Sequence, residues 1–210
     1  ATPWTRPDSL ENIIGLNAAN FPAPNAGDGV HIENAHTNTI GTVSAFGGNV
    51  ISGNGRDGVR IGPSSTRNYL YQNRIGLDTN GTSARANGGE GVHIYRASHN
   101  VISSNTGPRN VISGNAGSGV LIEDNALAYN NTVQNNYIGT DVSGGIGIGN
   151  SDHGVRVAGG VSNMIGNASA GNVISANDRT GVRLDSLASY NQVVKNLIGL
   201  DAAGATALGN

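Results

Sequence analysis

Three acidic residues each stand directly before a glycine at comparable places in the sequence: Asp28, Asp57 and Glu90. Two carboxyl groups held a few ångströms apart can hydrolyse a glycosidic bond, one as acid and the other as base or nucleophile. A histidine follows three residues later in two cases, as His31 and His93. Because imidazole transfers protons near neutral pH, these five residues are the candidate catalytic residues of a glycoside hydrolase or polysaccharide lyase.

The position before the glycine also has a simpler explanation. Further along the chain it holds Ser118, His153 and Thr180, each again directly before a glycine. Short polar side chains close turns by hydrogen bonding to nearby backbone groups. Catalysis and turn formation therefore both stay open as hypotheses for this position.

A second series of residues suggests a binding surface. In the recurring pattern Gly-Val-x-Ile the apolar residues share one face of a strand, so the residue between them points outward. Along the chain that residue is His31, Arg60, His93, Leu121, Arg156 and Arg183. Arg60, Arg156 and Arg183, with Tyr95 two residues after His93, are the candidate ligand-binding residues for an anionic polysaccharide. The alternative is a solvated sheet face with ordinary ion pairs, each of which contributes little to stability.

All these residues belong to an internal repeat. Ile14-Gly15-Leu16-Asn17 recurs as similar tetrapeptides that begin at Ile75, Ile138 and Ile198, and an Asn-Val-Ile-Ser segment lies about halfway along each interval. Gly-Val-x-Ile and Asn-x-apolar blocks separate these segments. Each block has three to five residues, is rich in Val and Ile, and is bounded by Gly or Asn, which is typical of short strands. Three such strands per turn predict an all-β, three-faced solenoid.

The repeated isoleucine measures the length of each coil. Successive coils contain 37, 24, 37, 26, 36 and 24 residues, so about six coils alternate between long and short. The surplus of the long coils falls at about residues 17–28, 79–90 and 142–153, and we expect these loops to form a ridge along one edge. We expect an extension at residues 1–11 and repeats over 12–210, in open-ended units of about 14–74, 75–137 and 138–197 with a partial unit 198–210.

Glycine and asparagine are unusually frequent, with 33 glycines and 29 asparagines among 210 residues. Both residues tolerate the left-handed backbone that tight corners require. Asparagine side chains that stack from coil to coil can also pair their amides. This composition therefore fits a solenoid with many corners rather than a disordered linker.

The blocks Asn-Val-Ile-Ser-Gly-Asn, Gly-Val-x-Ile and Asn-x-Ile-Gly-x-Asp resemble the right-handed parallel β-helix repeats of the pectate-lyase-like superfamily. The resemblance is closest to repeat regions of secreted or surface-attached bacterial proteins, which implies a right-handed coil and a place outside the cell or on its surface. It supplies no catalytic residue. The Arg-x-Pro-x-x-Arg segment of pectate lyases is missing, and of the polygalacturonase motifs only the fragment Ser151-Asp152-His153-Gly154 comes near.

Composition and charge exclude several classes of partner and cofactor. The net charge of −2 gives no field that attracts nucleic acid, and no apolar run is long enough to span a membrane. The chain has no cysteine, so it has no disulfide and no thiolate metal site. Asp78, Asp141 and Asp201 recur about two coils apart, too far to share one calcium ion. We therefore expect no cofactor, with a loop-bound calcium ion as the alternative.

Neither end of the repeat carries an obvious cap, although solenoids normally cover their terminal coils. Further repeats of a longer chain, or self-association through the open solenoid ends, would cover them. We expect a non-enzymatic extracellular structural or adhesive module, with an end-to-end filament as one form. The alternative is a β-helix that binds or degrades polysaccharide.

Overall fold

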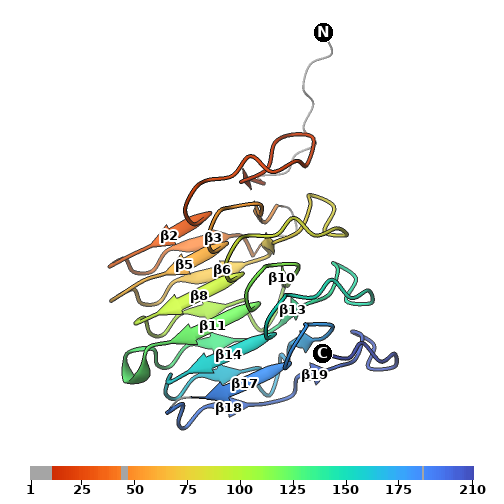
Figure 1. Ribbon diagram of the computed structural model, residues 1–210. Coiled ribbons are helices and arrows are strands. Elements are labelled where there is room, and N and C mark those ends of the chain that lie inside the picture. Colours follow the sequence, from red (N-terminus) through yellow and green to blue (C-terminus); the bar gives the residue numbers. More distant parts are fainter. Residues whose placement is uncertain (1–10, 44–46, 186) are drawn as a thin grey trace.

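The computed structural model describes residues 11–43, 47–185 and 187–210. Of the predicted extension 1–11, only Glu11 belongs to this part of the chain. The strands of the described residues form three parallel sheets that wind into a right-handed β-helix of about six coils (Figure 1). In the same residues one 3-10 turn, η1 (Asn125–Leu127), interrupts the β-structure, and no helix is long and apolar enough to cross a membrane.

The strands follow the three blocks of the repeat. The first sheet contains β1 (Ile13–Ile14), β4 (Val50–Ile51), β7 (Arg74–Ile75), β10 (Asn110–Ile112), β13 (Asn136–Ile138), β16 (Val173–Ile174) and β19 (Leu197–Ile198). The second sheet contains β2 (Val30–Ile32), β5 (Val59–Ile61), β8 (Val92–Tyr95), β11 (Val120–Glu123), β14 (Val155–Ala158) and β17 (Val182–Asp185). The third sheet contains β3 (Thr39–Gly41), β6 (Tyr69–Tyr71), β9 (Val101–Ile102), β12 (Thr132–Val133), β15 (Met164–Ile165) and β18 (Gln192–Val193).

The strands have two to four residues and are shorter than the predicted three to five. The corners explain the difference. Directly after Ile75, for example, Gly76 has φ +89°, and a Cβ atom there would lie 2.2 Å from the backbone oxygen of Ser113 in the next coil. A left-handed residue packed this closely against its neighbour ends the strand and requires glycine.

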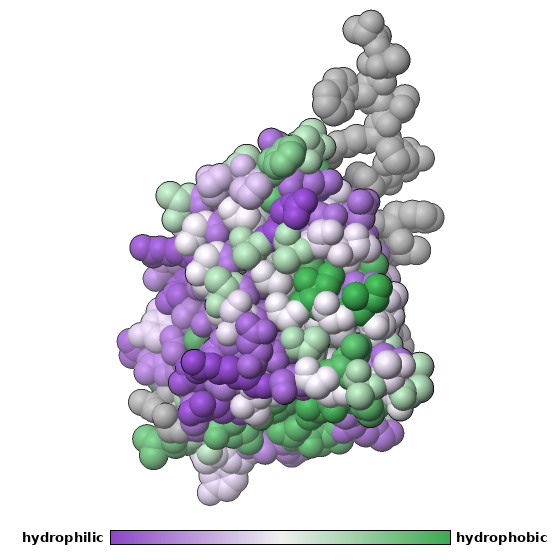
Figure 2. All heavy atoms as spheres, turned by 45° about the vertical axis from the view of Figure 1, so that its right-hand side comes forward, coloured by the Kyte–Doolittle hydropathy of each residue, from purple (hydrophilic) through white to green (hydrophobic). Residues whose placement is uncertain are grey.

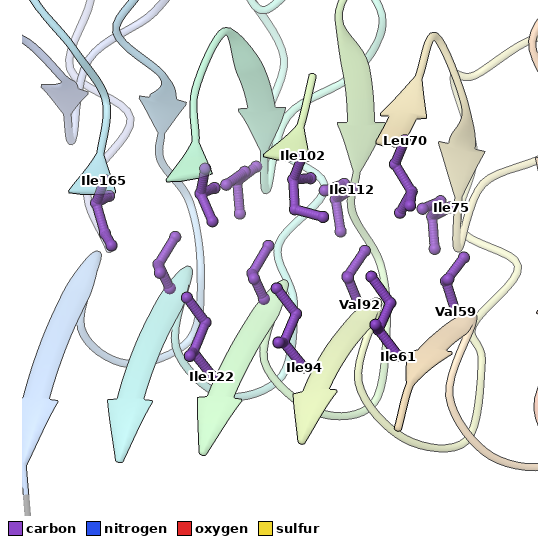
Figure 3. Packing of buried hydrophobic residues seen from close by; sticks show 14 of the residues in the cluster. Val59, Ile61, Leu70, Ile75, Val92, Ile94, Ile102, Ile112, Ile122 and Ile165 are labelled. Atoms are coloured by element: carbon purple, nitrogen blue, oxygen red, sulfur yellow. The ribbon is translucent and has the colours of Figure 1, made fainter. Parts of the chain in front are cut away.

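The core is a column of stacked aliphatic side chains enclosed by the three sheets (Figure 3). The register stacks similar aliphatic side chains of successive coils, so Ile51 pairs with Ile75, and Ile75 with Ile112. These isoleucines are completely buried. Each coil alone could not bury its apolar face, so the stacking of neighbours stabilises all of them.

Three columns of asparagine run along the corners, and we call them the asparagine ladders. They contain Asn12, Asn49, Asn73, Asn110, Asn136, Asn172 and Asn196; Asn38, Asn68, Asn100, Asn131, Asn163 and Asn191; and Asn25, Asn54, Asn87, Asn115, Asn150, Asn177 and Asn210. Each Nδ2 donates to the Oδ1 of the next rung, as Asn49 does to Asn73 at 2.9 Å. The predicted amide pairing between coils is thereby confirmed.

The loops of the long coils stack on one another and form a ridge, which we call the loop ridge (residues 17–22, 78–84, 141–147 and 201–207). They follow one another down the right-hand side of Figure 1. Backbone hydrogen bonds join successive loops, from Val142 N–H to Gly81 O at 3.2 Å and from Ala202 N–H to Gly144 O at 2.9 Å. The predicted ridge is therefore a continuous surface rather than a row of separate loops.

An aspartate organises the loops of the ridge from within. Asp78 Oδ1 accepts the backbone N–H groups of Thr82 and Ser83 at 2.9 and 3.2 Å. Asp141 Oδ1 accepts two N–H groups of its own loop in the same way, at 3.1 Å each. These are Asx-type turns, in which the aspartate side chain binds backbone groups a few residues further along the chain.

Candidate functional site

The outer face of the second sheet brings together several of the predicted residues. Asp57, His93 and Glu123 come from three successive coils and form a hydrogen-bonded row across the strands. His93 Nδ1 lies 2.9 Å from Asp57 Oδ2, and His93 Nε2 lies 2.8 Å from Glu123 Oε1. The side chains of Asp57 and His93 are only 10% and 9% exposed. We call Asp57, Arg60, Glu90, His93 and Glu123 the polar cluster.

Arg60 completes the contacts of Asp57. Its Nη1 lies 3.3 Å from Asp57 Oδ2 and 2.7 Å from His93 Nδ1, so both basic groups converge on one carboxylate oxygen. The guanidinium also stacks over Tyr95, with Cζ 5.3 Å from the ring centroid, and Arg96 lies over the same ring at 6.0 Å. The structure therefore joins the predicted ligand-binding residues Arg60 and Tyr95 to the predicted catalytic residues Asp57 and His93.

These contacts move the pKa values of the two central groups. Burial alone raises the pKa of Asp57, but hydrogen bonds from His93 and the Glu90 backbone, with the charges of His93 and Arg60, hold it below its ordinary value. Burial and the charge of Arg60 lower the pKa of His93, but the hydrogen bond and charge of Asp57, with the charge of Glu123, hold it above its ordinary value. Both shifts favour an imidazolium beside a carboxylate.

The pKa of Glu90 is shifted in the opposite direction to that of Asp57. Burial and the nearby charge of Asp57 raise the pKa of the Glu90 carboxyl, against the hydrogen bond that its Oε2 accepts from the Ser118 N–H. Neighbouring carboxyl groups whose pKa values move apart can divide the roles of acid and base between them. This electrostatic asymmetry is the feature of the face that most resembles a catalytic site.

The same carboxylates also fix the turn before the second sheet. Asp28 Oδ1 accepts the N–H of Asp57 at 3.1 Å, and Asp57 Oδ1 accepts the N–H of Glu90 at 2.9 Å. Further along the column, His153 Nδ1 accepts the N–H of Thr180 at 3.2 Å. Each side chain thus binds the backbone of the following coil, which is the contact that the turn hypothesis predicts.

The remaining predicted residues lie apart from the polar cluster. His31 pairs with Asp28 at 3.0 Å in the first coil, where its side chain is 44% exposed. Arg156 and Arg183 lie in the last two coils, and both bind Asp185 Oδ2, at 3.3 and 2.7 Å. The predicted basic column is therefore divided into separate ion-paired groups.

Sequence reasoning missed two acidic partners and the burial of one apolar residue. Glu123 pairs with Tyr95 in register, yet it reaches diagonally to His93. Asp152 accepts a hydrogen bond from Ser118 Oγ at 2.9 Å and pairs with Arg179. Leu121, on the outer face, is only 6% exposed. The spacing of the repeat predicts which residues stack in one column from coil to coil, whereas these contacts join residues of different columns.

Comparisons with other proteins add no identity. The chain matches no protein-family model, no curated protein and no solved structure.

Among the described residues, no group of three or more acidic or histidine side chains is placed to hold a metal ion. A loop-bound calcium ion stays a prediction.

Proposed function

We propose that this chain is a non-enzymatic structural module of an extracellular β-solenoid, comparable to the repeat regions of secreted or surface-attached bacterial proteins in the pectate-lyase-like superfamily. It extends as a stiff rod and presents the loop ridge along one edge as an adhesive or display surface. Its terminal coils join it to further coils of the same design, as a filament or as part of a longer solenoid.

The last coil carries this proposal. Its inward-facing side chains Leu184, Val193 and Ile198 are 45, 43 and 44% exposed, whereas the residues paired with them one coil earlier are completely buried. Apolar surface therefore gathers at the C-terminal end of the solenoid, along the lower edge of Figure 2. A further coil would bury these side chains and pair the strand edges β17, β18 and β19.

Electron microscopy and sedimentation velocity of the unmodified chain test the self-assembling form of this function. At rising protein concentration we expect rods to join end to end, because the exposed surface lies on the end coil and not along the side. Raised salt should leave assembly intact, since the contact consists of aliphatic side chains and strand edges. Single short rods at every concentration would contradict this form.

One observation favours a second candidate function, a polysaccharide-degrading β-helix. Asp57 has a lowered pKa and Glu90 a raised one, and they belong to adjacent coils. Glu90 would donate a proton to the leaving oxygen, Asp57 would act as base or nucleophile, and Arg60 with Tyr95 would hold an anionic sugar. The hydrogen bonds that occupy these carboxylates in the turn make this the weaker candidate.

Replacing Asp57 with Asn tests the enzymatic function. If it holds, the unmodified chain degrades at least one polysaccharide in a panel of anionic and neutral substrates, and Asp57→Asn lowers the rate by about 100-fold or more. Asp28→Asn is the matched control, since Asp28 holds the same turn position beside an exposed histidine. No activity in the unmodified chain, or equal activity in Asp57→Asn, removes this candidate.

A further inference from the structure

Two segments at opposite ends of the solenoid have similar structures, with loops that differ in length by one residue. Residues 12–25 contain β1 and the first loop, and residues 196–210 contain β19 and the last loop. In the first, Leu16 bridges Pro22 and the N–H of Ala23 donates to Gly15 O at 2.8 Å. In the second, Leu200 bridges Ala207 and the N–H of Leu208 donates to Gly199 O at 2.8 Å.

The two segments also occupy the same place in the repeat. Ile13 and Ile14 pair with Val50 and Ile51 of β4. Leu197 and Ile198 pair with Val173 and Ile174 of β16, so β19 presents a free edge to any following coil. In the repeat, a strand that is followed by a long loop, such as β19, is paired with a strand from an Asn-Val-Ile segment in the next coil. β4 is a strand of this kind.

The strand numbers limit how two copies can join. The first sheet has seven strands and the other two have six. Suppose that β17 and β18 of one copy pair with β2 and β3 of a second copy. Then β19 of the first copy lies beside β4 of the second copy, in the place that β1 of the second copy occupies. A continuous joint therefore requires residues 12–25 of the second copy to leave their place to residues 196–210 of the first.

Both end surfaces carry apolar side chains and the last rungs of asparagine ladders. A hollow of about 360 Å³ opens at the N-terminal end, and Val30 and Ile40, which lie outside the displaced segment, belong to its lining. In the joint, the exposed Leu184 and Val193 of the other copy would stack over this end. Asn196 and Asn210 would continue two asparagine ladders onto Asn49 and Asn54, which now accept from Asn12 and Asn25 at 2.8 and 2.9 Å.

Electrostatic interactions with Arg74 favour residues 12–25 of the same chain over residues 196–210 of a second copy. Arg74 forms an ion pair with Glu11, two residues before β1. The residue at the equivalent position before β19 is Lys195. In the joint Lys195 would replace Glu11 beside Arg74, so an attraction would become a repulsion. The chain's own segment therefore has an advantage over the segment of a second copy.

We propose that residues 12–25 occupy the docking site for residues 196–210 of a second copy, so that their displacement opens the solenoid to continuous head-to-tail stacking. This inference rests on the proposed structural function and specifies its joint. The partner is a second copy of this chain, the contact is heterologous, and it repeats without closing, which generates a filament.

A pair of glycines tests the joint. A Cβ atom at Gly15 would lie 2.2 Å from the backbone oxygen of Ser52, whereas at Gly199 the nearest atom would be 4.0 Å away. Gly15→Ala therefore weakens the docking of residues 12–25, whereas the methyl group of Gly199→Ala meets no close neighbour in the single rod. In the joint, however, Gly199 meets Ser52 of the neighbour, so Gly199→Ala blocks assembly. Both positions have positive φ, +87° and +76°, so both variants carry similar backbone strain.

The measurement is sedimentation velocity over a concentration series, with electron microscopy of the products. We expect Gly15→Ala to form linear rods at a concentration at least about tenfold below that of the unmodified chain, because the binding-competent fraction rises. Gly199→Ala should form none, and the double variant should resemble Gly199→Ala. Non-specific aggregation of a loosened segment would not be suppressed by Gly199→Ala, so the double variant separates assembly from misfolding.

Arg74→Glu gives an independent test at a position with no backbone strain. It removes the pairing with Glu11 and places a carboxylate where Lys195 of a second copy arrives, so assembly should again begin at lower concentration. The joint is overturned if neither Gly15→Ala nor Arg74→Glu promotes assembly, or if Gly199→Ala assembles as readily as Gly15→Ala. If the unmodified chain assembles while these variants change nothing, only the joint fails and the structural function stands.

Discussion

Asn110→Ala should lower the free energy of unfolding by about 3–5 kcal/mol, since it leaves several buried groups without partners at about 1–3 kcal/mol each. Asn110 is completely buried in the middle of a ladder. Its Oδ1 accepts the backbone N–H and the Nδ2 of Asn73 at 2.9 and 3.1 Å. Its Nδ2 donates to Leu70 O and to Asn136 Oδ1, both at 2.9 Å. Alanine removes all four contacts.

Asn25→Ala is the matched control at the exposed end of a ladder. Its Nδ2 donates to Asn54 Oδ1 at 2.9 Å, and water can replace that contact, so the loss should stay near 0.5 kcal/mol. Urea unfolding of both variants, compared at equal slope, measures the difference. Equal losses in the two variants would mean that the ladders do not hold the coils together.

The fold could be predicted from the sequence because its period is the period of the structure. Ile51, Ile75 and Ile112 mark successive coils in the sequence, and the same residues pair in register in the first sheet. The asparagine ladders follow for the same reason. Contacts within the loop ridge could not be predicted, since Val142 reaches Gly81 through the conformation of two loops and not through a repeated spacing.

The candidate site was predictable only in part. Asp57 and His93 come together because they occupy neighbouring columns on adjacent coils, which the repeat already specifies. The pairing of His93 with Glu123 depends on the diagonal reach of both side chains, and the repeat does not encode it. The equivalence of residues 12–25 and 196–210 was visible as similar sequence, but the conflict between β1 and β19 required the strand count of each sheet.

Asp57→Ala should have the second largest effect, a loss of about 2–4 kcal/mol in the free energy of unfolding near pH 5.5. The substitution leaves the N–H of Glu90 without its acceptor at 2.9 Å and the buried His93 without its partner at 2.9 Å. Removing one partner from a buried charged pair is costly, because the other charge then lacks compensation. Arg60 loses the same carboxylate.

The pH dependence of this loss follows from the two pKa shifts. The pKa of His93 is raised above 6.5, so its contribution is complete below pH 6.5 and disappears as the pH rises through the folded value. The pKa of Asp57 is lowered below 3.8, so its contribution is present above pH 3.8 and disappears as the pH falls through the folded value. Both stabilise the protein between these limits. Glu90, raised from 4.5, loses its contribution as the pH rises.

Asp28→Ala is the control that separates the turn from the buried pair. Asp28 accepts the N–H of Asp57 at 3.1 Å, but its histidine, His31, has a side chain that is 44% exposed. We expect a loss of about 1 kcal/mol, the value of one hydrogen bond to the backbone. Urea unfolding at pH 5.5 and pH 8 should show a smaller penalty for Asp57→Ala at the higher pH, and at pH 5.5 a larger penalty for Asp57→Ala than for Asp28→Ala. Equal penalties for Asp57→Ala at both values would mean that His93 is not held as an imidazolium by Asp57.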